Sequence, residues 1–141
     1  MAIYRRAPPG RLKMNHYVLD ASALLALLKL EARGEQVAEA IANGAAISVV
    51  NFSEVVAKLS EAGMPELAIH ESLDSLGIEV VDFNAEFAYK VGLLQPLTRH
   101  AGFSLGDRAC LALAQHLNLP ALTTDRAWEN LSLGIVVQVI R

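Results

Sequence analysis

Residues 16–30 read HYVLDASALLALLKL and give the clearest indication of the fold class. The apolar run 16–20 predicts a β-strand, and the leucines and alanines of 21–30 have the spacing of a helix. Asp20 stands at the junction. A strand that passes directly into a helix is typical of proteins whose parallel strands are connected by helices. We therefore expect an α/β protein.

The same alternation continues along the chain. Further strands are predicted at 47–50, 78–83, 121–124 and 135–140, and further helices at 33–43, 52–61, 65–76, 84–96 and 107–117. Right-handed crossovers between parallel strands place helices on both faces of the sheet. The prediction is a three-layer α/β/α sandwich around a central, mainly parallel sheet. Ligands bind such sheets beyond the carboxyl ends of the strands, so the functional site is sought there.

Composition limits the class of protein. The chain has 141 residues, of which 53% are hydrophobic, and one cysteine, Cys110. A single cysteine allows neither an intrachain disulfide nor a thiolate metal cage, and no uncharged apolar run reaches the roughly 18 residues that span a bilayer. We therefore expect a cytoplasmic protein that is not inserted in a membrane. The apolar excess favours interfaces with other proteins.

The first 13 residues differ from the rest. They contain four of the 12 basic residues and none of the 15 acidic ones, so 14–141 carry a net charge of -7. We expect 1–13 to be a disordered basic leader, from an upstream start codon or left by cloning, with a nucleic-acid-binding arm as the alternative. The folded domain is expected at 14–141. Any RNA contact there needs a local basic patch against an acidic background.

Four acidic residues are the candidates for chemistry: Asp20, Glu54, Asp107 and Asp125. Three of them fall at or just after predicted strand ends, and Asp107 begins a predicted helix. Each has a structural alternative, because acids at helix starts cap free backbone amides, and Asn51-x-x-Glu54 resembles a capping box. Their joint position on one rim of the sheet favours an active site.

Carboxylates brought together repel one another, and a divalent cation relieves that repulsion. Oxygen ligation without a histidine or cysteine cluster favours Mg²⁺ or Mn²⁺ over Zn²⁺. The reaction that this predicts is metal-assisted phosphodiester hydrolysis. Asp20 and Asp107 rank as the surest ligands, followed by Glu54, whereas Asp125 is expected to act through water or by positioning.

Neighbouring residues are candidates for support. The hydroxyls of Ser22 and Thr123 are expected to orient a carboxylate or a water, with helix capping and strand propensity as the alternatives. Possible RNA contacts are Lys58, Arg99, Arg108 and Arg126, for which surface ion pairs are an equal alternative.

Four segments resemble the motifs of a known family, the PIN-domain ribonucleases, and above all the VapC-like toxins of bacterial type II toxin-antitoxin pairs. The segments are VLDAS at 18–22, NFSEV at 51–55, SLGD at 104–107 and TTDRAW at 123–128. The resemblance implies that Asp20, Glu54, Asp107 and Asp125 hold the metal with help from Ser22. It also implies RNA as the substrate, a homodimer, and a small antitoxin that blocks the site.

Other readings compete with the nuclease. The segment 102–106 matches the G-x-S-x-G motif of α/β-hydrolases, but no strand precedes Ser104 and no histidine follows Asp125, so no triad forms in the required order. A receiver-like signalling module with Asp82 as phosphoacceptor is a second alternative. A metal-binding interaction module without catalytic activity is a third. Trp128 is expected to be a packing anchor, with base stacking as the alternative.

Overall fold

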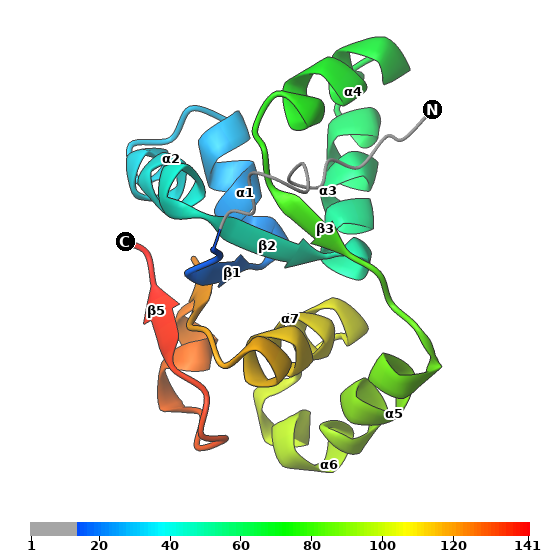
Figure 1. Cartoon of the computed structure of the whole chain (residues 1–141), viewed down its shortest axis with the longest axis vertical. Helices are drawn as coiled ribbons and strands as arrows, with labels where there is room; N and C mark the ends of the chain where they lie inside the picture. Colours follow the sequence, from blue (N-terminus) through cyan, green and yellow to red (C-terminus); the bar gives the residue numbers. More distant parts are fainter. Residues whose placement is uncertain (1–13) are drawn as a thin grey trace.

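The computed structural model describes residues 14–141, which form a five-stranded parallel sheet covered by helices on both faces (Figure 1). The strands are β1 (Tyr17–Leu19), β2 (Ala45–Ser48), β3 (Glu79–Val81), β4 (Ala121–Thr123) and β5 (Val137–Val139). They lie in the order β3-β2-β1-β4-β5, and every pair is parallel. The predicted α/β/α sandwich is confirmed. The predicted leader at 1–13 lies outside the described residues.

The helices form two layers. One contains α1 (Ala21–Leu28), α2 (Gly34–Asn43), α3 (Val49–Glu61) and α4 (Glu66–Asp74). The other contains α5 (Ala85–Leu93), α6 (Gln95–Thr98) and α7 (Leu105–Leu117), with the short 3-10 helices η1 (Arg99–Ala101) and η2 (Arg126–Asn130) also in this half of the chain. No helix within 14–141 is long and apolar enough to cross a membrane.

Each strand supplies both layers because successive side chains point to opposite faces. Val18 packs with α7, whereas Leu19 packs with the helices of the first layer. Ala121 and Leu122 of β4 divide in the same way. The two cores therefore hold the central strands β1 and β4 from both sides, which fixes the ends of these strands and the residues that follow them.

The start of α3 differs from the prediction. The strand before it occupies Ala45–Ser48 rather than 47–50, and the helix begins at Val49 rather than 52. Ser48 is the reason, because its Oγ accepts a hydrogen bond from Val50 N–H at 3.2 Å and caps the helix. Asn51 consequently lies within α3, and its interpretation as the start of a capping box was wrong.

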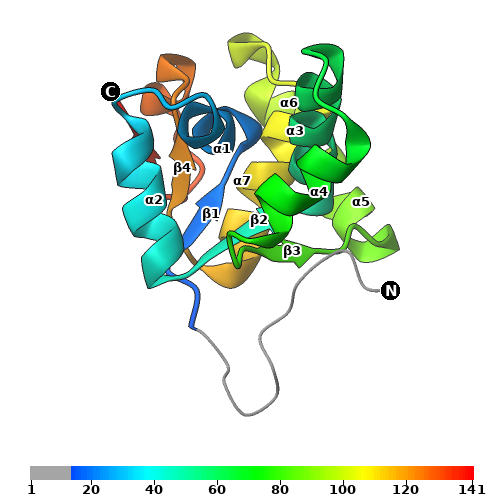
Figure 2. The same cartoon turned by 90° about the horizontal axis from the view of Figure 1, so that it is seen from above.

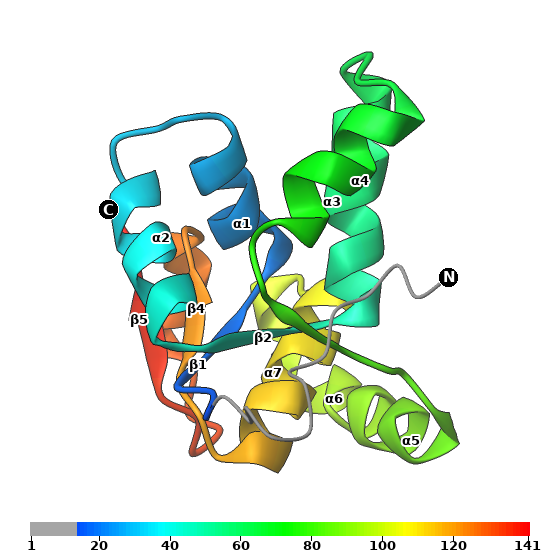
Figure 3. The ribbon, with the colours of Figure 1, turned by 45° about the horizontal axis from the view of Figure 1, so that its top comes forward.

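Helix α3 links the sheet to the second layer. Figure 2 shows α3 and α4 side by side, and Figure 3 shows α3 rising from the end of β2. Its first turns also contact α7.

The predicted helix 84–96 is divided, since α5 ends at Leu93 and Pro96 lies in the first turn of α6. The segment that follows leads into α7, whose start meets α3.

Candidate active site

Asp20 lies where β1 ends and α1 begins, and its side chain is 4% exposed. Oδ1 accepts hydrogen bonds from Ala23 N–H at 2.8 Å and from Ser22 Oγ at 2.8 Å. Oδ2 accepts one from Thr123 Oγ1 at 2.5 Å. Asp20 is therefore a helix cap, which was the structural alternative to a catalytic role, and also a buried carboxylate held by helix α1 and strand β4.

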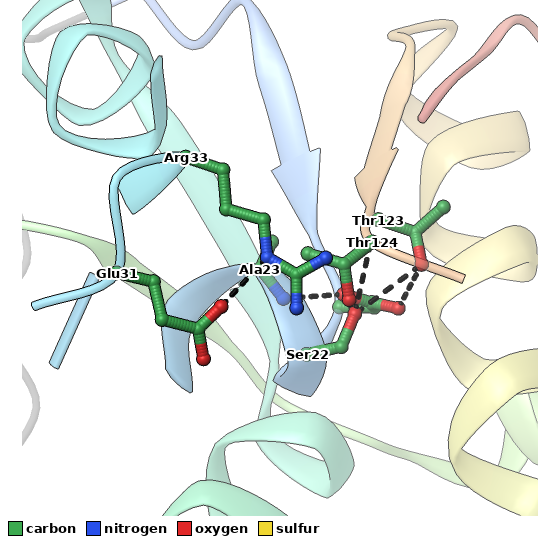
Figure 4. A network of polar contacts seen from close by, with 7 residues as sticks. Ser22, Ala23, Glu31, Arg33, Thr123 and Thr124 are labelled. Atoms are coloured by element: carbon green, nitrogen blue, oxygen red, sulfur yellow. Dashed lines mark hydrogen bonds and ion pairs between the residues drawn. The ribbon is translucent and has the colours of Figure 1, made fainter. Parts of the chain in front are cut away.

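Two hydroxyls order this carboxylate (Figure 4). Ser22 Oγ donates to Asp20 and accepts from Thr124 N–H at 3.0 Å, while Thr123 Oγ1 donates to Asp20 and accepts from Asp125 N–H at 3.0 Å. Each hydroxyl has one proton, and both protons are donated to Asp20. No proton is left to form a hydrogen bond between the two hydroxyl oxygens, which lie 3.3 Å apart. The network ties the end of β4 to the start of α1.

Burial raises the pKa of Asp20 from 3.8 to about 6. The hydrogen bonds from Thr123, Ala23 and Ser22 favour the ionised form and lower the pKa, and the negative charge of Asp107 raises it again. At neutral pH the carboxylate is mainly ionised in a setting that penalises its charge. A cation would relieve this penalty.

The pKa gives a test of stability against pH. A folded pKa above the unfolded value means that the stability from Asp20 is fully present below about pH 4 and is lost as the pH rises through about 6. In EDTA at pH 8, the free energy of unfolding of Asp20→Asn should therefore exceed that of the parent chain by up to about 3 kcal/mol. At pH 4 the two free energies of unfolding should be equal. Urea denaturation at both pH values measures the difference. If the difference in free energy of unfolding between the variant and the parent chain were the same at both pH values, the raised pKa of Asp20 would be contradicted.

Glu54 faces the same region from α3. Its Oε1 accepts a hydrogen bond from Asn51 Nδ2 at 3.3 Å, and a Cβ atom added to Gly106 would lie 1.8 Å from that oxygen. The carboxyl group thus lies against the first turn of α7. Partial burial there raises the pKa of Glu54, and the charges of Asp107 and Asp20 raise it further.

Asp107 lies in that first turn of α7. Its Oδ2 accepts a hydrogen bond from Ser104 N–H at 2.9 Å, and its own N–H donates to Ser104 Oγ at 3.2 Å, which makes a capping box. Ser104 is therefore the helix-entry residue that the sequence indicated, and no nucleophile elbow. The charge of Asp107 acts on both Asp20 and Glu54, so these three carboxylates form one electrostatic group.

Asp125 is placed differently. Its side chain is exposed and caps η2, because Oδ1 accepts from Ala127 N–H at 2.9 Å. Its link to Asp20 runs through its backbone N–H and Thr123. The structure thus brings three of the four acids into one group and joins the fourth to it through a neighbour.

Comparison with protein-family models gives a match to a known family. The family model of the PIN domain matches residues 17–133, which is most of the described chain and contains all four acids. The chain belongs to the PIN-domain family.

Solved structures share the fold of this PIN domain. VapBC2 from Rickettsia felis, bound to a promoter DNA fragment, gives a TM-score of 0.70 at 18% identity over 89% of this chain and 98% of that one. DNA-bound VapBC from Salmonella typhimurium gives 0.70 at 20% identity over the same shares. VapBC-5 from Mycobacterium tuberculosis gives 0.58 at 21% identity over 91% and 99%. Comparison with curated protein sequences gave no match.

The donor set of the PIN domain can be compared with what a cation needs. Three carboxylates and two hydroxyls offer only oxygen, which suits a hard divalent ion. Among residues 14–141, however, no three acidic, histidine or cysteine side chains approach as a complete ligand set. The oxygen chemistry of the site fits a hard divalent ion.

The candidate RNA contacts fall into different settings. The positive charge of Lys58 partly offsets the rise in the pKa of Glu54, and Arg99 and Arg126 are exposed. Arg108 Nη1 donates to Val91 O at 3.1 Å, a contact with α5 that makes it the weakest candidate. Arg33, which the sequence analysis did not name, donates from its Nε to Glu31 Oε1 at 2.7 Å. In the view of Figure 4 its side chain extends toward Ser22 and Thr124.

Two further expectations are decided by burial and strand order. Trp128 is 0% exposed and packs against Phe103, with ring centroids 5.2 Å apart, so it is the packing anchor and does not stack a base. Asp82 follows β3, which is an edge strand here. The receiver order 2-1-3-4-5 places that strand inside the sheet, so the receiver alternative is wrong.

Thr123→Val tests the ordering of Asp20. Valine has the same shape but leaves Asp20 Oδ2 and Asp125 N–H without this partner, so the free energy of unfolding should fall by about 1–3 kcal/mol. Thr124→Val is the matched control, because Thr124 contributes to the network only through its backbone N–H, and it should change stability by less than about 0.5 kcal/mol. Equal losses in the two variants, measured in urea at pH 7, would count against the network.

Proposed function

We propose that the chain is a divalent-metal-dependent endoribonuclease that hydrolyses RNA phosphodiester bonds with Mg²⁺ or Mn²⁺. The observation that supports this most is the electrostatic group formed by Asp20, Glu54 and Asp107, which come from three separate elements at the carboxyl ends of β1 and β2 and the start of α7. Membership of the PIN-domain family supports a nuclease in particular.

The acidic residues and the two hydroxyls of the site have different roles in the proposed reaction. Asp20, Glu54 and Asp107 would hold the ion, and Asp125 would position a water or the ion through its exposed carboxylate. A bound ion would act as a Lewis acid toward the phosphodiester. Ser22 and Thr123 keep the Asp20 carboxylate in one orientation, so its ordering cost is met before RNA arrives.

RNA binding would rely on cations around this rim. Lys58, Arg99 and Arg126 are the proposed backbone contacts, and Arg33 joins them. The described residues carry a net charge of -7, so each cation should matter more than it would on a basic surface. The affinity for RNA should fall steeply with salt.

The proposed biological role is that of a toxin whose activity inhibits translation or growth in the cytoplasm until a small cognate antitoxin blocks the site. The similar structure VapBC-5 from Mycobacterium tuberculosis is described as a member of the VapBC family of toxin-antitoxin systems, which supports such a partner. We also propose a homodimer. Apolar side chains exposed on α5 and α6 support it, namely Tyr89, Leu93 and Leu97.

The test uses the purified chain freed of any partner and a panel of folded RNAs. We expect cleavage with Mg²⁺ or Mn²⁺, none in EDTA, and recovery when the ion is restored. Several RNAs are needed because such nucleases can require one structured target. Binding of Mn²⁺ without cleavage of any RNA in the panel would instead favour a metal-binding interaction module without catalytic activity.

A further inference from the structure

Asn51 is a buried polar residue that the sequence analysis placed only as a helix cap. It is 2% exposed and lies one turn before Glu54 on α3. Its Nδ2 donates to Gly106 O at 3.0 Å and to Glu54 Oε1 at 3.3 Å. The first bond joins residues 55 positions apart and ties α3 to the start of α7.

The orientation of this amide is determined by its partners. Both are oxygens that only accept, so a flipped amide would place Oδ1 against two acceptors. In the observed orientation Oδ1 is buried and has no hydrogen-bond partner among the described residues. An unpaired buried carbonyl costs folding free energy, and an apolar side chain would avoid that cost. The two donated bonds offset that cost, and one of them goes to the carboxylate of Glu54.

Gly106 leaves room for the Glu54 carboxylate against the first turn of α7. An added Cβ would lie 1.8 Å from Glu54 Oε1 and 2.7 Å from Cδ, so a larger residue here would displace the carboxylate from this position. The backbone carbonyl of the same residue accepts from Asn51. Asn51 and Gly106 thus enclose one carboxylate beside Asp107, although the negative charges of Glu54 and Asp107 repel each other.

We propose that Asn51 is a positioning residue of the metal site, which together with Gly106 holds the Glu54 carboxylate beside Asp107 before a cation arrives. This rests on the proposed function, in which these acids bind a divalent ion. Groups that orient ligands typically change metal affinity by about 10–100-fold when removed. Asn51 is buried and acts through Glu54.

Calorimetric titration with Mn²⁺, without RNA, tests the proposal. Asn51→Ala and Gly106→Ala should each weaken binding by at least about tenfold. The double variant should be no more than about threefold weaker than the worse single one, because both act on the same carboxylate. The matched control is Val55→Ala, which removes a fully buried side chain from the same helix. It should lower stability in urea and leave Mn²⁺ affinity within twofold.

A second measurement needs no substitution. On titration of the parent chain with Mg²⁺, the side-chain amide NMR signals of Asn51 should shift, whereas those of exposed Asn43 should not. If Mn²⁺ binds the parent chain and Asn51→Ala equally, or the Asn51 signals stay unchanged, the positioning role is overturned while the proposed nuclease stands. If the parent chain binds no Mn²⁺ and cuts no RNA, the proposed function fails and the positioning role with it.

Discussion

Asp20→Asn should reduce RNA cleavage by about 10³-fold while the fold is retained. The amide keeps the shape of the carboxylate, and its Oδ1 can still accept from Ala23 N–H and Ser22 Oγ. Thr123 Oγ1 can accept from the new amide by turning its proton away from residue 20. What is lost is the negative charge that a divalent ion requires. Initial cleavage rates at saturating Mg²⁺ measure the effect.

The control for this variant is Asp82→Asn, which removes an exposed acid beyond the edge strand β3. It should cleave RNA within about twofold of the parent chain. Circular dichroism and urea denaturation verify that both variants are folded. Cleavage by Asp20→Asn at more than a tenth of the parent rate would show that Asp20 is only a cap of α1.

Trp128→Ala should lower the free energy of unfolding by about 3–5 kcal/mol. The indole is fully buried in the second core, and its removal leaves a cavity between Phe103 and the last strand. Trp128 also fixes η2, which begins directly after Asp125. Loss of this anchor should therefore loosen the segment that positions Asp125. Urea denaturation followed by circular dichroism is the measurement, since Trp128 is the only tryptophan.

Trp128→Phe separates packing from polarity. The Nε1 of Trp128 is buried and has no hydrogen-bond partner among the described residues, so phenylalanine gives up no polar contact. It should cost less than half of the alanine loss, because most of the ring remains. If Trp128→Ala instead weakened RNA binding without a loss of stability, base stacking would be the correct role.

The fold was predicted correctly at positions where the residue pattern of a strand is clearly distinct from that of the following helix. Residues 16–30 pass from a strand to a helix with no turn, and the structure has β1 and α1 there. The prediction was wrong at β2, because Ala45 and Ala46 have little strand propensity and Val49 and Val50 have much. Tertiary pairing with β1 and the cap at Ser48 decide that boundary, and neither is visible in a local pattern.

The acids were predictable, and their surroundings were not. Asp20 and Asp107 stand beside helix starts and strand ends, positions that sequence alone identifies. The contact between Asn51 and Gly106 spans 55 residues and depends on how α3 crosses α7. Asn51 and Glu54 are three residues apart, so within a helix they share one face. Their pairing could be predicted from the sequence only if the helix was placed with its start before residue 51. The misplaced start of α3 therefore hid the positioning residue.

The central claim is that Asp20, Glu54 and Asp107 bind one divalent ion. Crystals of the chain grown with Mn²⁺, measured near the manganese absorption edge, test it directly through the anomalous difference map. We expect an anomalous peak within ligand distance of carboxylate oxygens of all three residues, and no such peak in crystals of Asp20→Asn. A peak held by other residues, or none at a Mn²⁺ concentration that supports RNA cleavage, would contradict it.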